Sequence, residues 1–169
     1  MLINYKNPQR AKKYLLNITN ALESAEKVLK LSSNEIEINV TFVSRLAIKK
    51  LNKNTRNVNR VTDVLSYPNL LQDDGEVIDK KLSKKNFPYD INPETGNIVV
   101  GDIVICVPRC IAQSKKYGTT KTREICYLSV HGLLHLLGYD HIKEEDKIIM
   151  RPKEEKVLNQ LGITRNELE

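Results

Sequence analysis

The sequence predicts an α/β protein of the α+β type, with one small mixed β-sheet packed against helices. Residues 35–42 alternate polar and apolar side chains, which is typical of a strand with one buried face. Residues 98–106 are nearly continuous in β-branched residues, which indicates a central strand buried on both faces. Around these strands, apolar residues recur at three- and four-residue steps, as in amphipathic helices. Such a mixed pattern is explained by helices that cover a sheet.

The 169 residues are enough to bury a core without disulfides or structural metals, so we expect one domain spanning residues 1–169. A helix is predicted to start at Asn7 and Pro8. Its apolar face comprises Leu15, Ile18, Leu22, Ala25 and Leu29. The strand at 35–42 should lie at an edge of the sheet because its other face is polar. Ser44 can cap a short helix from Arg45 to about Lys53.

The middle of the chain is expected to hold a loop, a strand and a long excursion. Residues 52–56 are read as a loop, and a strand runs from Thr62 to Tyr67, where Pro68 ends it. We expect this strand to lie between the other two. Residues 69–97 are polar and proline-containing, so they predict a mobile excursion, whose lysines at 80–85 are more simply solvated surface than RNA contacts.

The last third is helical in pattern. Pro108 suits the first turn of a helix that ends at Tyr117 and Gly118, and Thr120 can cap the long helix that follows. Residues 143–161 are helical again, with Pro152 read as the first turn of a second segment. Three apolar residues should bury this last helix, namely Val157, Leu158 and Leu161.

Net charge, cysteine content and the length of apolar runs limit the kinds of partner and compartment that we expect for this protein. The formal charge of +6 favours an anionic partner such as nucleic acid, although a solvated surface explains it equally well. Cys106, Cys110 and Cys126 are odd in number and lie among apolar residues, so we expect free buried thiols in a reducing cytoplasm. The N-terminus has no signal-peptide pattern, and no apolar run approaches the roughly twenty residues that cross a bilayer, so no membrane partner is expected.

The three histidines of the chain all lie within eleven residues. Residues four apart share one face of a helix, so His131 and His135 present both imidazoles together. Gly138 can adopt a positive φ that ends the helix and returns His141 to the same point. Three nitrogen ligands suit zinc or another borderline divalent metal and leave a coordination position open for water or substrate.

The same spacing occurs in metzincin-like zinc peptidases, whose signature is H-E-x-x-H-x-x-G-x-x-H. The glutamate of that signature is the general base, and here its position is Gly132. Glycine cannot accept a proton, so the HxxxHxxGxxH metal geometry is retained without the peptidase base.

The extended motif H-G-x-L-H-L-x-G-Y-D-H resembles the YbeY family of endoribonucleases. Thr62 to Pro68 is similar to that family's T-D-V-L-S-F-P segment, with Tyr67 in place of phenylalanine, and residues 101–105 resemble its G-D-I-V-I strand. Arg56 falls where the family has a functionally important arginine. Without the resemblance, a solvated loop cation is the simpler explanation of Arg56.

The resemblance implies a single-strand-specific, metal-dependent endoribonuclease that acts in ribosomal RNA processing, including small-subunit rRNA 3′-end maturation, and in ribosome quality control. It implies one zinc ion per chain at His131, His135 and His141, with nickel as an alternative, and Arg56 as the catalytic cation. The implied partners are ribosomal RNA and the small ribosomal subunit, and no DNA substrate is expected.

Phosphodiester cleavage at such a site leaves the general base open. A metal ion can activate water or polarise a phosphoryl oxygen, and the planar guanidinium of Arg56 can stabilise charge on the nonbridging oxygens. Asp63, Asp102 and Asp140 each adjoin a motif, but each could instead cap a turn or orient a histidine. The 2′-hydroxyl of RNA could also attack in place of water.

Two other functions remain open. The first is a noncatalytic RNA-binding factor in ribosome assembly, stabilised by its metal. The second is a metallopeptidase, which the glycine at position 132 argues against.

Overall fold

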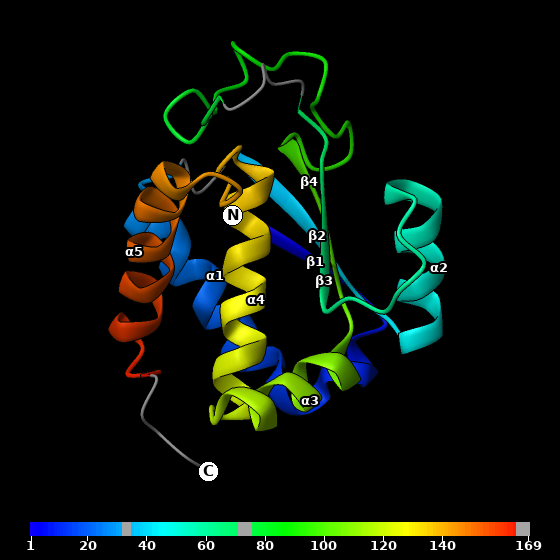
Figure 1. Cartoon of the computed structure of the whole chain (residues 1–169). Coiled ribbons are helices and arrows are strands. Elements are labelled where there is room, and N and C mark those ends of the chain that lie inside the picture. The colour runs from blue at the N-terminus through cyan, green and yellow to red at the C-terminus, as the bar shows by residue number, and fades with distance from the viewer. Residues whose placement is uncertain (32–34, 71–75, 165–169) are drawn as a thin grey trace.

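The computed structural model describes residues 1–31, 35–70 and 76–164. Helices cover both faces of one sheet, which confirms the predicted fold class (Figure 1). The strands are β1 (Leu2–Lys6), β2 (Ile36–Phe42), β3 (Val64–Pro68) and β4 (Ile98–Ile105). The helices are a 3-10 helix (Pro8–Tyr14), α1 (Leu15–Leu29), α2 (Arg45–Arg56), α3 (Val107–Tyr117), α4 (Lys121–Leu136) and α5 (Glu144–Gln160).

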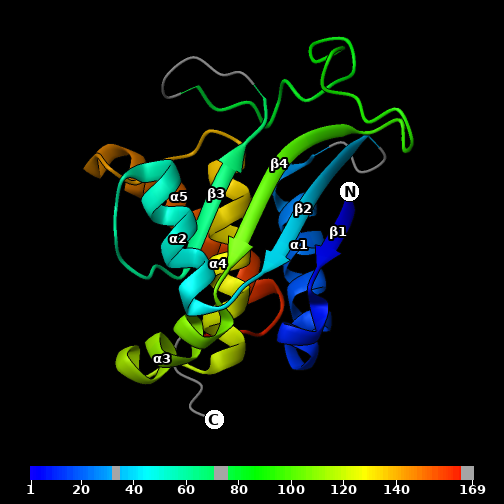
Figure 2. The ribbon, with the colours of Figure 1, turned by 90° about the vertical axis from the view of Figure 1, so that its right-hand side faces the viewer.

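The strand order is β1-β2-β4-β3, in which β1, β2 and β4 run parallel and β3 runs antiparallel to β4. Helices α1, α4 and α5 lie on one face of the sheet, and α2 lies on the other (Figures 1 and 2). The larger apolar core lies between the sheet and the three-helix layer, and a smaller cluster under α2 contains Ile48, Leu65, Val104 and Cys106. In the described part of the chain, no helix is both long and apolar enough to cross a membrane.

The strand order corrects two expectations. Strand β1 was not predicted, and because it pairs with β2, the strand predicted at an edge is internal. Its polar face is covered: Glu37 is 2% exposed and accepts hydrogen bonds from Asn92 Nδ2 at 2.7 Å and Thr95 Oγ1 at 2.5 Å. Strand β3 lies at the opposite edge rather than between its neighbours, and the central position of β4 is confirmed.

Two helix boundaries also differ from expectation. Helix α2 continues to Arg56, so residues 52–56 are helical and the turn falls at Asn57, which has φ 57°. Helix α5 runs unbroken through Pro152. Proline removes one hydrogen bond to the carbonyl of Ile148, but Ile148 is 68% exposed, so water can replace it.

Residues 76–97 run over one end of the sheet and are anchored to it. Residues 71–75 of the predicted excursion lie outside the described residues. The backbone N–H of Ile78 donates to the Leu137 carbonyl at 3.0 Å, and the buried Tyr139 hydroxyl donates to Asp79 Oδ2 at 2.6 Å. Leu70, Ile78 and Leu82 are buried in the larger core. Mobility of this segment stays a prediction.

Candidate metal centre

The end of α4 presents the first two histidines, as the sequence predicts. Thr120 caps the helix by accepting a hydrogen bond from the backbone N–H of Arg123 at 3.0 Å. Gly138 follows the helix with φ 89°, a conformation that favours glycine, and the chain turns back there to His141. The donor atoms of His131, His135 and His141 all lie within 4.8 Å of one another, so the structure brings the predicted ligands together.

The arrangement of ring nitrogens fits a cation. Glu154 Oε1 lies 2.7 Å from His131 Nδ1, so the carboxylate holds a proton on that nitrogen and leaves a lone pair on Nε2. His131 Nε2 faces His135 Nε2 at 3.0 Å. A hydrogen bond with the backbone of Tyr139 engages the His135 ring as well. Bare lone pairs at this separation repel, and a metal ion between the rings converts the repulsion into coordination.

Glu154 is a site residue that the sequence analysis missed. It lies on α5, is 2% exposed, and its carboxylate contacts Nδ1 of the His131 ring. A carboxylate that accepts the second ring proton of a ligand histidine fixes its tautomer and orientation. A signal existed, because Glu154 lies three and four residues before the buried Val157 and Leu158 and so occupies a core-facing position of the helix.

Burial is the main reason that His135 is a neutral ligand. Desolvation, and then the neighbouring His131 and His141 imidazoles, lowers the pKa of His135 from 6.5 to about 4. The ring is therefore uncharged at neutral pH. Metal coordination requires this unprotonated form, because a proton on Nε2 would occupy the lone pair that binds the ion.

Gly132 lies on the buried side of the metal helix. A Cβ at this position would be 2.7 Å from Ile103 Cγ2 on β4 and 3.3 Å from Ser66 Oγ on β3. The missing side chain therefore lets α4 approach the sheet closely. A glutamate, as in the peptidase signature, would be directed into the sheet and could not act at the metal.

A groove of about 920 Å³ runs from the metal site along α4. His131 and His141 lie at one end of it, and Asp63 and Gln113 at the other. Four acidic and two basic side chains line it, namely Asp63, Glu124, Glu154, Glu155, Arg123 and Arg151. Arg123 is paired with Glu155 at 2.7 Å, so this groove is not a strongly basic channel.

Arg56 lies at the last turn of α2, and its Nη2 donates to the backbone carbonyl of Ser66 on β3 at 3.2 Å. The Ser66 side chain is on the opposite face of that strand, beside Gly132 of α4. Arg56 is therefore anchored to the strand that packs against the middle of the His131–His135 turn. The predicted catalytic role of Arg56 stays a prediction.

The three candidate aspartates have other positions. Asp63 Oδ1 accepts from the backbone N–H of Val64 at 2.8 Å, and its Oδ2 accepts from Gln113 Nε2 at 2.7 Å. Asp102 precedes Ile103, whose side chain faces α4, so Asp102 projects from the other face of β4.

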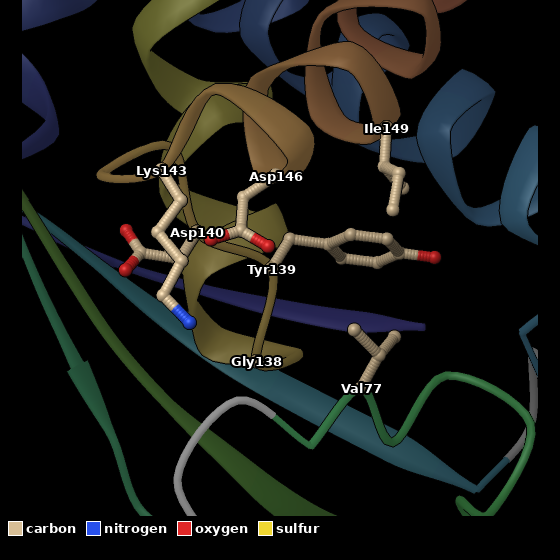
Figure 3. Close-up of a pocket in the computed structure, with 7 residues that line it drawn as sticks. All are labelled: Val77, Gly138, Tyr139, Asp140, Lys143, Asp146 and Ile149. Carbon is tan, nitrogen blue, oxygen red and sulfur yellow. The ribbon is translucent and has the colours of Figure 1, made fainter.

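Asp140 caps the turn that carries the third histidine, since its Oδ1 accepts from the backbone N–H of His141 at 2.7 Å. Figure 3 shows Asp140, Lys143, Asp146 and Val77 among the residues that line a cavity. This cavity has a volume of about 320 Å³. Asp63 and Asp140 thus have structural explanations, and Asp102 is exposed on the face of β4 away from α4.

Comparisons with known proteins find matches over nearly the whole chain. A family model described as Endoribonuclease YbeY matches residues 3–162. A relative with that name from Clostridium tetani (strain Massachusetts / E88) is 42% identical over 164 residues, 96% of each chain. One from Clostridium kluyveri (strain NBRC 12016) is 45% identical over 142 residues, 83% of this chain and 85% of the relative.

A solved structure also matches. The solution structure of a Thermotoga maritima protein is similar with a TM-score of 0.57 and 23% identity, and the match covers 96% of this chain and 92% of that one. At this identity the similarity concerns the fold alone.

Proposed function

This chain belongs to the YbeY endoribonuclease family, and from that premise we propose that it is a single-strand-specific, metal-dependent endoribonuclease. We place its action in ribosomal RNA processing in the cytoplasm, including small-subunit 3′-end maturation and ribosome quality control, with the small ribosomal subunit as partner. The observation that carries the proposal is the three-histidine cluster, whose lone pairs converge as a metal site requires. Three free cysteines fit a reducing compartment.

The metal site would hold one zinc ion, with nickel as an alternative, through His131, His135 and His141. When bound, the ion supplies Lewis-acid activation of water and of a phosphoryl oxygen. Glu154 keeps His131 in the tautomer that can bind the ion. Arg56 would donate to the nonbridging phosphate oxygens as negative charge builds on them.

The nucleophile that fits the site best is the 2′-hydroxyl of the RNA itself. Asp63 and Asp140 hold hydrogen bonds within the protein and Asp102 faces away, so these carboxylates are engaged elsewhere than in positioning a water, whereas the 2′-hydroxyl is already next to the phosphorus. Attack of the 2′-oxygen on phosphorus, with its proton passing to solvent, expels the 5′-oxygen, which takes a proton from solvent; the products are a 2′,3′-cyclic phosphate and a 5′-hydroxyl. Products with a free 3′-hydroxyl would instead identify water as the nucleophile.

The test is digestion of a single-stranded RNA by the purified protein, with and without a chelator. We expect cleavage that chelator abolishes, no cleavage of DNA of the same sequence, and no digestion of casein. His135→Ala should abolish cleavage together with metal content. If RNA is bound but never cleaved by metal-replete protein, the noncatalytic assembly factor replaces this proposal.

Arg56 gives the second arm of the test. Loss of one donor to the transition state lowers turnover by about 10² to 10³, so Arg56→Ala should have this effect while RNA affinity changes little. Arg56→Lys should restore little, because an ammonium cannot contact two phosphate oxygens in the bidentate geometry of a guanidinium. Equal cleavage by wild type and Arg56→Ala would remove Arg56 from the active site.

A further inference from the structure

The positive charge of the chain is concentrated in one short segment, residues 45–60. This segment contains six basic residues and no acidic one, namely Arg45, Lys49, Lys50, Lys53, Arg56 and Arg60. The chain has 27 basic and 21 acidic residues, so removing these six leaves 21 of each sign. The entire formal excess of +6 therefore lies on α2 and the turn that follows it.

The six basic residues have no acidic partner among the described residues. None of the six is in a salt bridge there, and five of them are exposed, at positions 45, 50, 53, 56 and 60. Arg45, Lys49, Lys53 and Arg56 fall within about 80° of one another around the helix, because each residue turns it by about 100°. They form a stripe along one side of α2.

This stripe opposes the stability of the helix that bears it. Like charges four residues apart repel, as Arg45 and Lys49 do, and Lys49 and Lys53. Arg45 also puts a cation in the first turn, where the helix dipole favours an anion, and no acidic residue is present there. A solvated surface alone does not explain such an arrangement, whereas an external polyanion does.

The stripe ends beside the metal site. Figure 1 shows α2 and α4 on opposite faces of the sheet, with the C-terminal ends of both helices at the same end of the molecule. At that end Arg56 donates to the Ser66 carbonyl of β3, and the Ser66 side chain lies beside Gly132, between the two metal ligands of α4. Only the edge strand β3 separates the stripe from the metal helix (Figure 2).

We propose that α2 and residues 57–60 bind the phosphate backbone of single-stranded RNA outside the cleavage site, so that the strand passes over the edge of β3 to the metal centre. This inference rests on the proposed function. The groove along α4 is less suited to phosphates, because acidic residues outnumber basic ones in its lining. The basic stripe supplies the attraction that the groove lacks, without base contacts.

The experiment measures the affinity of a long single-stranded RNA for metal-free protein between about 50 and 200 mM salt. Each phosphate contact adds about 0.7 to the slope of log affinity against log salt for a single strand, so Arg45→Gln/Lys49→Gln/Lys53→Gln, which changes three residues of the stripe, should lower the slope by about 2. The control is Lys80→Gln/Lys84→Gln/Lys85→Gln, three exposed cations of the segment over the sheet. The control should keep the wild-type slope.

Further measurements distinguish an effect on RNA binding by α2 from an effect on the cleavage step. The α2 variant should cleave a short oligonucleotide at the wild-type rate and melt at or above the wild-type temperature, because it removes repulsion along the helix, while its KM for long RNA rises. Equal slopes for the α2 variant and wild type would overturn the proposal, as would an equal loss in the control. If wild type cleaves no RNA but the slope still falls selectively, the RNA surface stands and the proposed endoribonuclease activity fails.

Discussion

The ring of His131, one of the three candidate metal ligands, contacts the buried carboxylate of Glu154. Glu154 is 2% exposed and reaches its Nδ1 at 2.7 Å from a different helix. The carboxylate acts on metal binding through His131, by fixing the tautomer and orientation of its ring. Glu154 is thus a positioning residue, whose effect should appear first in metal affinity.

We predict that Glu154→Gln weakens metal binding by about 10- to 100-fold, because an amide is a poorer acceptor for the imidazole proton. The measurement is a competition titration against a chelator. Glu145→Gln on the exposed face of the same helix is the control, since the Glu145 side chain is 77% exposed. His135→Ala, which removes a ligand, serves as the reference for complete loss of metal binding. Wild-type affinity in Glu154→Gln would contradict the assigned role.

At the scale of elements, the contact between α4 and β4 determines where two ligands lie. Gly132 allows the helix to approach Ile103, and His131 and His135 flank this contact. A side chain here would push the helix away from the sheet and displace both imidazoles relative to His141. The glycine therefore has a packing reason as well as a chemical consequence, the absence of the peptidase base.

Gly132→Ala should lower the free energy of unfolding by about 1 kcal/mol and weaken metal binding. Alanine gains about 1 kcal/mol in helix propensity, but overpacking a core costs about 1–3 kcal/mol, and the Cβ would be 2.7 Å from Ile103 Cγ2. Urea denaturation measures the change. In an Ile103→Ala background the clash is removed, so there the same substitution should cost less. Stabilisation by Gly132→Ala alone would refute the close contact.

A hydrogen bond from Tyr139 to Asp79 joins the metal loop to the segment at 76–97. Burial raises the pKa of Tyr139, so its hydroxyl remains a donor to Asp79. We predict that Tyr139→Phe destabilises the protein by about 1–2 kcal/mol and speeds proteolysis within this segment. Tyr89→Phe is the control, because Tyr89 is 97% exposed. Equal proteolysis of both variants would show that this bond does not anchor the segment.

At the scale of the whole molecule, the three thiols report on global unfolding. All are buried, and burial raises the pKa of Cys126 from 9.0 to about 12 and raises that of Cys106 and Cys110 as well. A raised thiol pKa means that the folded state retains protons that the unfolded state releases. The stability contributed by these groups is therefore complete below about pH 9 and is lost as pH rises further.

We predict two outcomes for the reduced protein. A thiol reagent at neutral pH should label the native protein only as fast as it unfolds, and should label all three cysteines in urea. Urea midpoints should be flat from about pH 7 to 9 and then fall. Rapid labelling without denaturant would place a thiol at the surface. A midpoint that rises above pH 9 would reverse the expected sign.

Features that depend on local periodicity could be predicted from the sequence. A four-residue step on a helix and a glycine at the turn were enough to bring His131, His135 and His141 together, because these constraints act within eleven residues. The same holds for the alternation of β2 and the β-branched run of β4. The signal for Glu154 was also local, because it is an acidic residue at a core-facing position of its helix. Its partner, His131, lies on a different helix and could not be identified from this local signal.

Contacts between elements that are distant in the sequence could not be predicted and were found in the folded structure. The sheet order β1-β2-β4-β3 made β2 internal and put β3 at an edge, and packing of α5 on α4 brought Glu154 to His131. The hydrogen bond from Arg56 to the Ser66 carbonyl likewise joins α2 to the edge strand β3. Strand order and helix docking are set by burial of apolar faces summed over the whole chain, and no spacing within one segment encodes that sum.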